Sequence, residues 1–392
     1  MSALETFRNE TRTWLEANCP ASMREPDPTN KFAFYGGRNP TFISEDQKIW
    51  FERMVEKQWT IPHWPTEYGG GGLDDDENRI LHEELADLNC RTPLTGFGIW
   101  MLGPVLLKYG TEEQKSKHLR GITSGQVRWC QGYSEPGSGS DLASLRTQAV
   151  SDGDDYVING SKIWTSYANI SDSIFMLART SAESRHAGIS FMLVEDMKSE
   201  GIETNPIQLI SGNSPFCETH FTDVRTPKSN LIGAENQGWE IAMYLLQHER
   251  TNISTILLDM GEKMADVARE GVGLIDGKLA DPLLRKELAH LEMREMAIRY
   301  TGQRAEDESG AGSGGGHASA ALKYSAAEWN KSRNELIMAL SGFAGLGWEG
   351  KEFMDGHRAR SWLRTKANSI EGGTSEIQLN IISKRILGLP NN

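Results

Sequence analysis

Hydroxyl-bearing residues and glycines gather in one stretch of the chain that could hold a flat ligand. Residues 129–141 carry Ser134, Ser138 and Ser140 among glycines and a proline, which disfavour a helix interior. This stretch is expected to form a loop whose backbone approaches a ligand while its hydroxyls hydrogen-bond to it. Such a loop suits a planar cofactor with polar edges, such as a flavin, packed near Trp164. An ordinary Gly/Ser turn beside a core tryptophan is the alternative.

The segment that follows the loop predicts a β-hairpin. Asn159-Gly160 is a tight-turn signal between two strand-like runs, residues 155–158 and residues 161–165. This hairpin would bring Trp164 and the hydroxyl-lined loop together.

One carboxylate interrupts the apolar face of the helix that is expected after Gln237. Glu249 belongs to a stripe with alternating three- and four-residue spacing. The other members of this stripe are Ala242, Leu246, Ile253, Ile256 and Met260. A buried, unpaired carboxylate raises its pKa, and a raised pKa suits a general base that works near neutral pH. The alternative is a structural ion pair between Glu249 and Arg250 or another neighbour.

Length and charge limit the classes of function. A chain of 392 residues is too long for one compact core, so two or three domains are expected. The formal net charge of −13 argues against non-specific binding of nucleic acid or anionic lipid. An anionic ligand would then be held by local basic groups and backbone amides rather than by the overall field.

The cysteines and the N-terminal residues bear on location. Cys19, Cys90, Cys130 and Cys217 lack metal-binding spacing and predict reduced thiols in the cytoplasm. The N-terminal residues lack the apolar region of a secretory signal. No run approaches 18 apolar residues, so no membrane span is expected.

The rhythm of apolar residues predicts three domains. Residues 1–122 read as helical, residues 123–233 as mainly β, and residues 234–392 as helical again. The expected helices cover about 44–57, 75–88, 102–109, 112–122, 237–269, 282–302, 318–340 and 375–387. The expected strands include 155–158, 174–178, 189–194 and 220–223. The glycines at 310–315 have dinucleotide-fingerprint spacing but follow a polar stretch, so they predict a flexible loop.

Four separated motifs resemble those of the acyl-CoA dehydrogenases, and their order extends the resemblance over nearly the whole chain. The motifs are Tyr133-Ser134-Glu135-Pro136 with Gly139-Ser140-Asp141, then Asn159–Ser166, Phe221–Pro227 and Glu371–Gln378. The resemblance implies an α+β fold with an N-terminal helical domain, a middle β-barrel-like domain and a C-terminal four-helix bundle. It also implies FAD as the hydride acceptor, because no side chain takes hydride.

The resemblance assigns cofactor-binding roles to residues in three of these segments. They are Gln131, Tyr133, Ser134, Gly139, Ser140, Trp164, Ser166, Gly373, Thr374 and Glu376. Trp164 would pack near the face of the ring opposite the substrate, and Ser166 would reach the N5 side. Gly139 and Ser140 would lie beside the thioester. Thr374 also reads as a plain helix cap, and both roles can hold together.

The position of the base departs from the commonest family pattern. Many relatives place a glutamate directly before the Gly-Thr-Ser of the C-terminal motif, where this chain has Gly372, with Glu371 one residue early. Some members that act on branched, long or steroid-like acyl chains carry this glutamate on an earlier helix, directly before an arginine. Glu249, directly before Arg250, matches that placement. The resemblance therefore implies Glu249 as the base, with Glu371 as the alternative and Arg250 in an orienting role. The substrate residues that it implies are Ser140, Tyr244, Glu371 and Gly372.

The implied reaction is the α,β-dehydrogenation of an acyl-CoA to the 2-enoyl-CoA, with a bulky, branched or ring-bearing acyl group. The alternative is a non-catalytic or cofactor-sharing subunit of a heteromer, and an oxidase is a third option. Electron-transfer flavoprotein or a similar protein would accept the electrons. Ala268–Asp276 lacks the Phe-Gly with which many relatives contact a neighbouring subunit's FAD. Both a homotetramer and a heterotetramer with a related subunit therefore remain open.

Overall fold

The computed structural model describes residues 2–25, 27, 30–182, 185–259, 261–310 and 318–390. Side chains are not described for residues 247–248, 250–256, 259, 306 and 309–310. The chain forms two compact units, one of Met1–Pro206 with Pro215–Leu245 and one of Ile207–Ser214 with Leu246–Asn392. The three-domain boundaries at residues 122 and 233 stay a prediction.

The first unit begins with helices whose starts are fixed by side-chain caps. They are α1 (Ala3–Asn18), α2 (Glu45–Glu56), α3 (Asp75–Asp87) and α5 (Glu112–Thr123). Between α3 and α5, α4 (Gly103–Tyr109) follows a π-helical turn at Gly98–Leu102 and has a proline in its first turn instead of a side-chain cap. Ser2, Asp74 and Thr111 form capping boxes that satisfy exposed backbone N–H groups. Leu15 of α1, Trp50 of α2 and Leu81 of α3 are fully buried or nearly so and belong to one apolar cluster. These helices therefore begin and pack much as the periodicity predicts.

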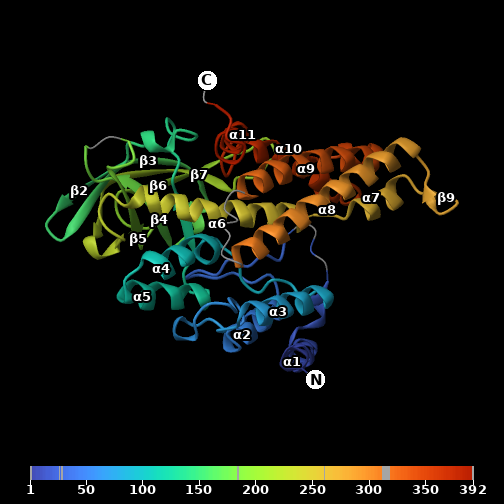
Figure 1. Cartoon of the computed structure of the whole chain (residues 1–392), viewed down its shortest axis with the longest axis horizontal. Helices are drawn as coiled ribbons and strands as arrows, with labels where there is room; N and C mark the ends of the chain where they lie inside the picture. Colours follow the sequence, from blue (N-terminus) through green and yellow to red (C-terminus); the bar gives the residue numbers. More distant parts are fainter. Residues whose placement is uncertain are drawn as a thin grey trace. The chain divides into compact units, whose positions relative to one another are not determined.

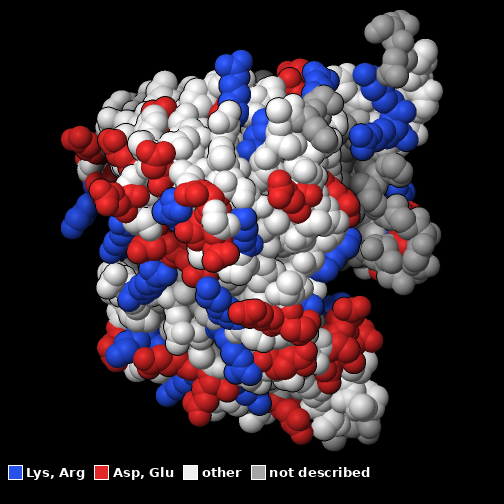
Figure 2. Space-filling model, turned by 90° about the vertical axis from the view of Figure 1, so that its left-hand side faces the viewer, with Lys and Arg blue, Asp and Glu red and all other residues white. Residues whose placement is uncertain are grey.

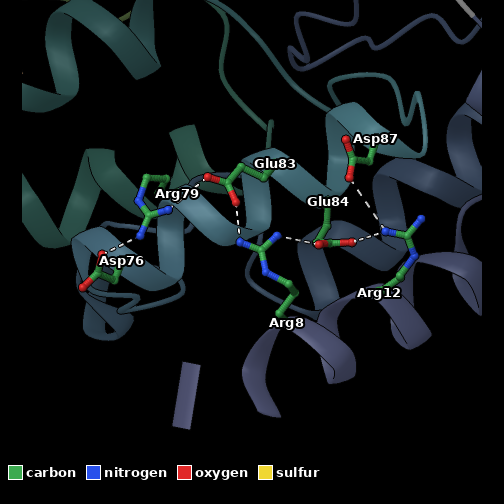
Figure 3. Close-up of polar contacts among 7 residues, drawn as sticks. All are labelled: Arg8, Arg12, Asp76, Arg79, Glu83, Glu84 and Asp87. Atoms are coloured by element: carbon green, nitrogen blue, oxygen red, sulfur yellow. Dashed lines mark hydrogen bonds and ion pairs between the residues drawn. The ribbon is translucent and has the colours of Figure 1, made fainter. Parts of the chain in front are cut away.

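A charged network joins α1 to α3 (Figure 3). Glu84 is 2% exposed and lies between two arginines, with Arg8 Nη1 at 2.7 Å and Arg12 Nη1 at 2.8 Å from its two oxygens. Arg8 also pairs with Glu83, and Arg79 pairs with Glu83 and Asp76 along the exposed side of α3. The buried carboxylate thus depends on two cations from the neighbouring helix.

Removing both cations should therefore cost far more than removing an exposed one. Arg8→Met with Arg12→Met leaves Glu84 buried and uncompensated, and we expect a loss of about 3–5 kcal/mol in the free energy of unfolding. The matched control, Arg79→Met, breaks pairs of an arginine that is 56% exposed and should cost less than about 1 kcal/mol. Urea denaturation measures both. Equal losses in the two variants would contradict this account of Glu84.

The rest of the first unit is built around a twisted mixed sheet, drawn in green and yellow in Figure 1. Its strands are β1 (Trp129–Gly132), β2 (Gln148–Asp152), β3 (Asp155–Ser166), β4 (Ser173–Arg179), β5 (Ile189–Val194), β6 (Ile202–Ile207), β7 (Phe216–Pro227) and β8 (Leu231–Ile232). The strand order is β6-β7-β3-β2-β4-β5-β8, and β1 pairs with β4 in parallel. Every residue of β5 is buried, which explains its continuous apolar run.

The predicted turn at Asn159-Gly160 is wrong, because β3 runs through these residues without a break. The hairpin turn lies instead at Gly153-Asp154, between β2 and β3. Asn159 exchanges two hydrogen bonds of 2.9 Å with Asp223, one to its side chain and one from its backbone amide. Gly160 is required by close packing, since a Cβ there would lie 2.6 Å from the hydroxyl of Thr147. Tertiary contacts, not a turn, therefore account for this Asn-Gly pair.

The second unit is helical. It contains the end of α6 (Gly238–Asp259), α7 (Met264–Gly271), α8 (Pro282–Gly310), α9 (Ala318–Ser341), α10 (His357–Thr365) and α11 (Ser375–Ile381). Figure 1 shows α8 and α9 side by side, and the apolar cluster of this unit includes Trp329, Leu336 and Leu291. The helix expected over 237–269 ends at Asp259, and α7 begins at Met264. Part of the loop expected at 310–315 lies outside the described residues.

A small hairpin follows α7 in the stretch where the family's Phe-Gly is missing. It pairs β9 (Leu274–Ile275) with β10 (Lys278–Leu279). The turn residues Asp276 and Gly277 both have positive φ, 49° and 73°, as a type I′ turn requires. Leu274 and Ile275 are more than half exposed.

The distribution of surface charge and the polarity of the helices agree with the acidic, polar composition of the sequence. Figure 2 shows Lys and Arg side chains scattered among Asp and Glu over the described residues of one face, rather than gathered into a basic patch. Among the described helices, none is both long and apolar enough to cross a membrane.

Candidate functional site

The hydroxyl-lined loop and the strand that carries Trp164 lie together, as the sequence predicts, although no hairpin between 155–158 and 161–165 joins them. The Ile163 amide donates to the Ser134 carbonyl oxygen at 2.9 Å. Lys162 Nζ donates to the Tyr133 carbonyl oxygen at 3.1 Å. Both bonds attach the loop to β3, so its backbone has a fixed position next to that strand.

A buried ion pair reinforces this attachment, and sequence reasoning missed it. Lys162 is fully buried, and its ammonium contacts Glu135 Oε1 at 2.8 Å. Glu135 is 8% exposed and also accepts hydrogen bonds from the backbone amides of Arg146 at 2.6 Å and Thr147 at 2.9 Å. The pair and these amides satisfy both carboxylate oxygens, which a buried charge requires.

The two pKa values in this pair move in the directions that burial and pairing dictate. Burial is the largest influence on Lys162 and lowers the pKa of its ammonium to about 8, against the opposing effect of Glu135. Burial alone would raise the pKa of Glu135, but Lys162, Thr147 and the Arg146 amide together hold it below its ordinary value.

Trp164 presents its ring outward from a strained backbone. The residue is 52% exposed and has a φ of 61°, which is uncommon for a bulky side chain. The register of β3 against β7 shifts between Lys162 and Thr165, so a bulge lies here. The ring touches only the edge of Phe216 among described rings, at a centroid distance of 6.0 Å. An exposed, flat indole held in a strained conformation fits the face of a planar ligand.

The other predicted loop residues divide into those that border open space and those that are buried. Ser140 is exposed, and a Cβ on Gly139 would meet no atom within 4 Å, so both border open space. Ser138 differs from the expectation, because it is buried and donates to the carbonyl oxygens of Asp141 and Leu142. Gln131, Ser134 and Ser166 are partly exposed, and Tyr133 is buried. Exposed hydroxyls, an open backbone position and an exposed indole are groups that suit a planar ligand with polar edges.

In the second unit, the two candidate bases have different surroundings. Glu371 is occupied: Arg364 Nη2 lies 2.7 Å from one of its oxygens and Asn368 Nδ2 lies 2.5 Å from the other. Glu249 is 7% exposed on α6, as its place in the apolar stripe predicts. The side chain of Arg250 lies outside the described residues.

The C-terminal motif opens α11. Gly372 and Gly373 have φ values of 64° and 92°, which explains the need for two glycines before the helix. Thr374 is the N-cap, and its hydroxyl accepts from the Ile377 amide at 3.2 Å, so its capping role is confirmed. Glu376 is exposed in the first turn.

Tyr244, the predicted substrate residue on α6, lies in an aromatic and cationic cluster of the first unit. Its ring meets that of Tyr109 edge-on at 5.6 Å, and Lys108 Nζ lies 4.0 Å from the ring centroid. Burial raises the pKa of its hydroxyl. Among the residues that the structure describes, no cluster of three His, Cys, Asp or Glu side chains could hold a metal ion.

Comparison with known proteins shows the family of the chain. Three family models match in order: the acyl-CoA dehydrogenase N-terminal domain at residues 2–126, the middle domain at 130–224 and the C-terminal domain at 236–387. The chain is 36% identical to acyl-CoA dehydrogenase IpdE1 of Mycobacterium tuberculosis (strain ATCC 25618 / H37Rv), over 100% of this chain and 99% of the relative. The chain belongs to the acyl-CoA dehydrogenase family. It is thus related to enzymes that are oxidoreductases, and its α+β fold of helical, β and helical parts is the family fold.

Other members of the acyl-CoA dehydrogenase family extend the likeness. The mitochondrial long-chain specific acyl-CoA dehydrogenase of Sus scrofa is 31% identical over 82% of this chain and 75% of its own length. Among solved structures, the Tcur3481-Tcur3483 steroid ACAD is 30% identical, with a TM-score of 0.79 over 100% of this chain and 99% of that one. The ChsE4-ChsE5 complex from Mycobacterium tuberculosis is 28% identical, with a TM-score of 0.75 over 100% and 99%.

Proposed function

We propose that this acyl-CoA dehydrogenase is FAD-dependent and converts a bulky, branched or ring-bearing acyl-CoA to its 2-enoyl-CoA, with Glu249 as the base. The observation that carries the proposal is the burial of Glu249, which is 7% exposed on α6. Glu371, the alternative base, contacts Arg364 through one oxygen and Asn368 through the other, which gives it a structural role. Glu249 is buried on a mostly apolar helix face, the environment in which a general base is made stronger.

FAD would supply the hydride acceptor when it is bound. On this proposal, Ser134 and Ser166 hydrogen-bond to its ring system and Trp164 packs on it, supported by the exposure of the indole. Gly139 leaves room for a ligand beside the loop. The remaining proposed contacts are Gln131, Tyr133, Ser140, Gly373, Thr374 and Glu376.

The thioester carbonyl needs a hydrogen-bond donor so that the neighbouring C–H becomes acidic, and one such donor typically lowers a barrier by about 3 kcal/mol. The Glu371 amide already donates to the Ala367 carbonyl oxygen at 3.0 Å. No acceptor for the Gly372 amide is among the described contacts. The Gly372 amide is therefore the proposed donor to the thioester oxygen, and Tyr244 and Ser140 are proposed to line the substrate.

The substrate class follows from the base and from the relatives. The helix-borne glutamate is the arrangement of family members that act on bulky acyl groups, and one solved relative is named a steroid ACAD. A cofactor-sharing subunit is the second candidate, because one solved relative is a ChsE4-ChsE5 complex. This chain keeps both flavin motifs and a buried glutamate, which favours a catalytic subunit in a homotetramer over one in a heterotetramer. An electron-transfer flavoprotein is the proposed acceptor, and a cytoplasmic location stays a prediction.

Purification of the chain alone tests the proposal. We expect a yellow protein whose flavin absorbance is bleached under anaerobic conditions by at least one member of a CoA-ester panel. A colourless chain that gains flavin only with a related subunit would show the cofactor-sharing alternative to be correct. A flavin that is bleached and then reoxidised rapidly by oxygen would identify an oxidase.

A further inference from the structure

An arginine of the first unit packs against two neighbouring tyrosine rings next to the proposed flavin segments. Arg128 directly precedes β1, and Tyr167 directly follows the last residue of β3. Tyr35 comes from the proline- and glycine-rich loop before α2. The Arg128 guanidinium carbon lies 4.5 Å from the Tyr35 ring centroid and 5.1 Å from that of Tyr167, and the two ring centroids are 5.4 Å apart. We call these three residues the Tyr35–Arg128–Tyr167 cage.

The guanidinium in this cage has no anionic partner among the described residues. The nearest acid is Asp172, but the contact at 2.8 Å is between its Oδ2 and the backbone amide of Arg128. The same oxygen also accepts from the Arg38 amide at 2.9 Å. By contrast, Arg8 and Arg225 of the same unit each have a carboxylate oxygen 2.7 Å from the guanidinium. Arg128 is therefore a cation that the fold holds but does not neutralise.

Holding this cation costs free energy that the rings recover only in part. Arg128 is partly buried, and burial lowers the pKa of its guanidinium. A cation–π contact recovers less free energy than the desolvation of a charge costs. Burial raises the pKa of the Tyr35 hydroxyl, so this group stays neutral. The cage thus brings together positive charge and hydrogen-bond donors, and no described residue supplies an anionic acceptor for the Arg128 guanidinium.

We propose that the Tyr35–Arg128–Tyr167 cage binds an oxyanion of the acyl-CoA, an inference that rests on the proposed function. A guanidinium that packs on tyrosine rings keeps N–H groups that can pair with a carboxylate or a phosphate. Two parts of the ligand carry such chemistry: a carboxylate on the acyl group, or a phosphate of CoA. The position of the cage beside Trp129 and Ser166 places it next to the two flavin segments in the sequence and in the first unit.

Paired CoA esters test this proposal in the purified holoenzyme. The probes are octanoyl-CoA, its ω-carboxylated analogue of the same chain length, and CoA alone, titrated anaerobically against flavin absorbance or by calorimetry. We expect Arg128→Gln to raise the half-saturating concentration of the carboxylated ester at least about tenfold, with little change for octanoyl-CoA. Arg128→Lys keeps the charge and should recover part of the difference. Arg120→Gln, at an exposed position on α5, is the matched control.

The outcomes separate the two sources of the oxyanion and the two proposals. Weaker binding of both esters and of CoA alone in Arg128→Gln would support the cage with a phosphate as its ligand. Equal binding by wild type and variant for all three probes would overturn it. Two other results would show a purely structural role and also overturn the proposal. One is an equal loss of binding for the two esters with unchanged binding of CoA alone. The other is an equal loss for the two esters together with a lowered melting temperature and flavin content in Arg128→Lys as well. If no ester bleaches the wild-type flavin, the proposed function fails instead.

Discussion

Glu249→Gln lowers the rate of anaerobic flavin reduction by an acyl-CoA by about 10²–10⁴-fold, the usual contribution of a general base. The amide keeps the size of the side chain but cannot take the α-proton. Glu249 is 7% exposed, and glutamine has nearly the same volume as glutamate, so the variant should still fold. Stopped-flow absorbance measures the rate, and flavin content and melting temperature show that the holoenzyme is intact.

Glu371→Gln is the control for this prediction. The structure gives Glu371 the role of holding Arg364 and Asn368 in place, so its loss should change the rate by about tenfold or less, well below the full effect of a base. If Glu371→Gln abolishes flavin reduction while Glu249→Gln stays active, the roles must be exchanged. Substrate binding that persists in both variants would confirm that chemistry, not affinity, is affected.

Lys162→Met should cost about 3–5 kcal/mol in the free energy of unfolding, because it leaves Glu135 buried and unpaired. The same change should lower the flavin content, since Lys162 also holds the Tyr133 carbonyl and thereby the proposed flavin loop. Urea denaturation and the ratio of flavin to protein absorbance measure the two effects. The double variant Lys162→Met with Glu135→Leu removes both charges and should recover much of the lost stability.

Lowering the pH should reduce the difference in the free energy of unfolding between the wild type and Lys162→Met. The folded-state pKa of Glu135 is lowered in the wild type, so its contribution is present above the unfolded value of about 4.3 and is lost as pH falls through the folded pKa. In Lys162→Met the Glu135 carboxyl has no cation beside it and takes up a proton at a higher pH than in the wild type. Protonation removes the unpaired buried charge, so the destabilisation of the variant decreases as the pH falls. A deficit that is constant from pH 7 to pH 4 would contradict an electrostatic origin.

Much of the fold could be predicted from local pattern. The strand at 189–194 has the predicted limits, because a fully buried strand is a continuous apolar run. The Asn159-Gly160 turn failed because the pattern of turn residues carries no information about Asp223 or Thr147, the distant groups that these residues contact. The hairpin at Asp276-Gly277 was missed although its dipeptide is a strong turn signal.

The site was predictable where residues act locally and not where distant residues meet. Glu249 is buried, as helical spacing predicts, and Thr374 caps α11, as its position before the helix predicts. The Glu135–Lys162 pair joins residues 27 positions apart, and Glu135 belongs to a Gly/Pro-rich loop that reads as exposed. No pattern in the loop shows that its carboxylate turns inward. Only the three-dimensional arrangement reveals that partner.

The bulge in β3 also governs how this strand tolerates changes in length. In a regular strand, residues two apart share a face, so Lys162 and Trp164 would both point inward or both outward. The bulge breaks this alternation and lets one short segment hide a cation and display an indole. Insertion or deletion of a single residue here would turn either the Lys162 or the Trp164 side chain to the opposite face of the sheet, whereas many substitutions would leave both directions unchanged. Over evolutionary time, the segment between Lys162 and Thr165 should therefore vary in composition far more readily than in the number of its residues.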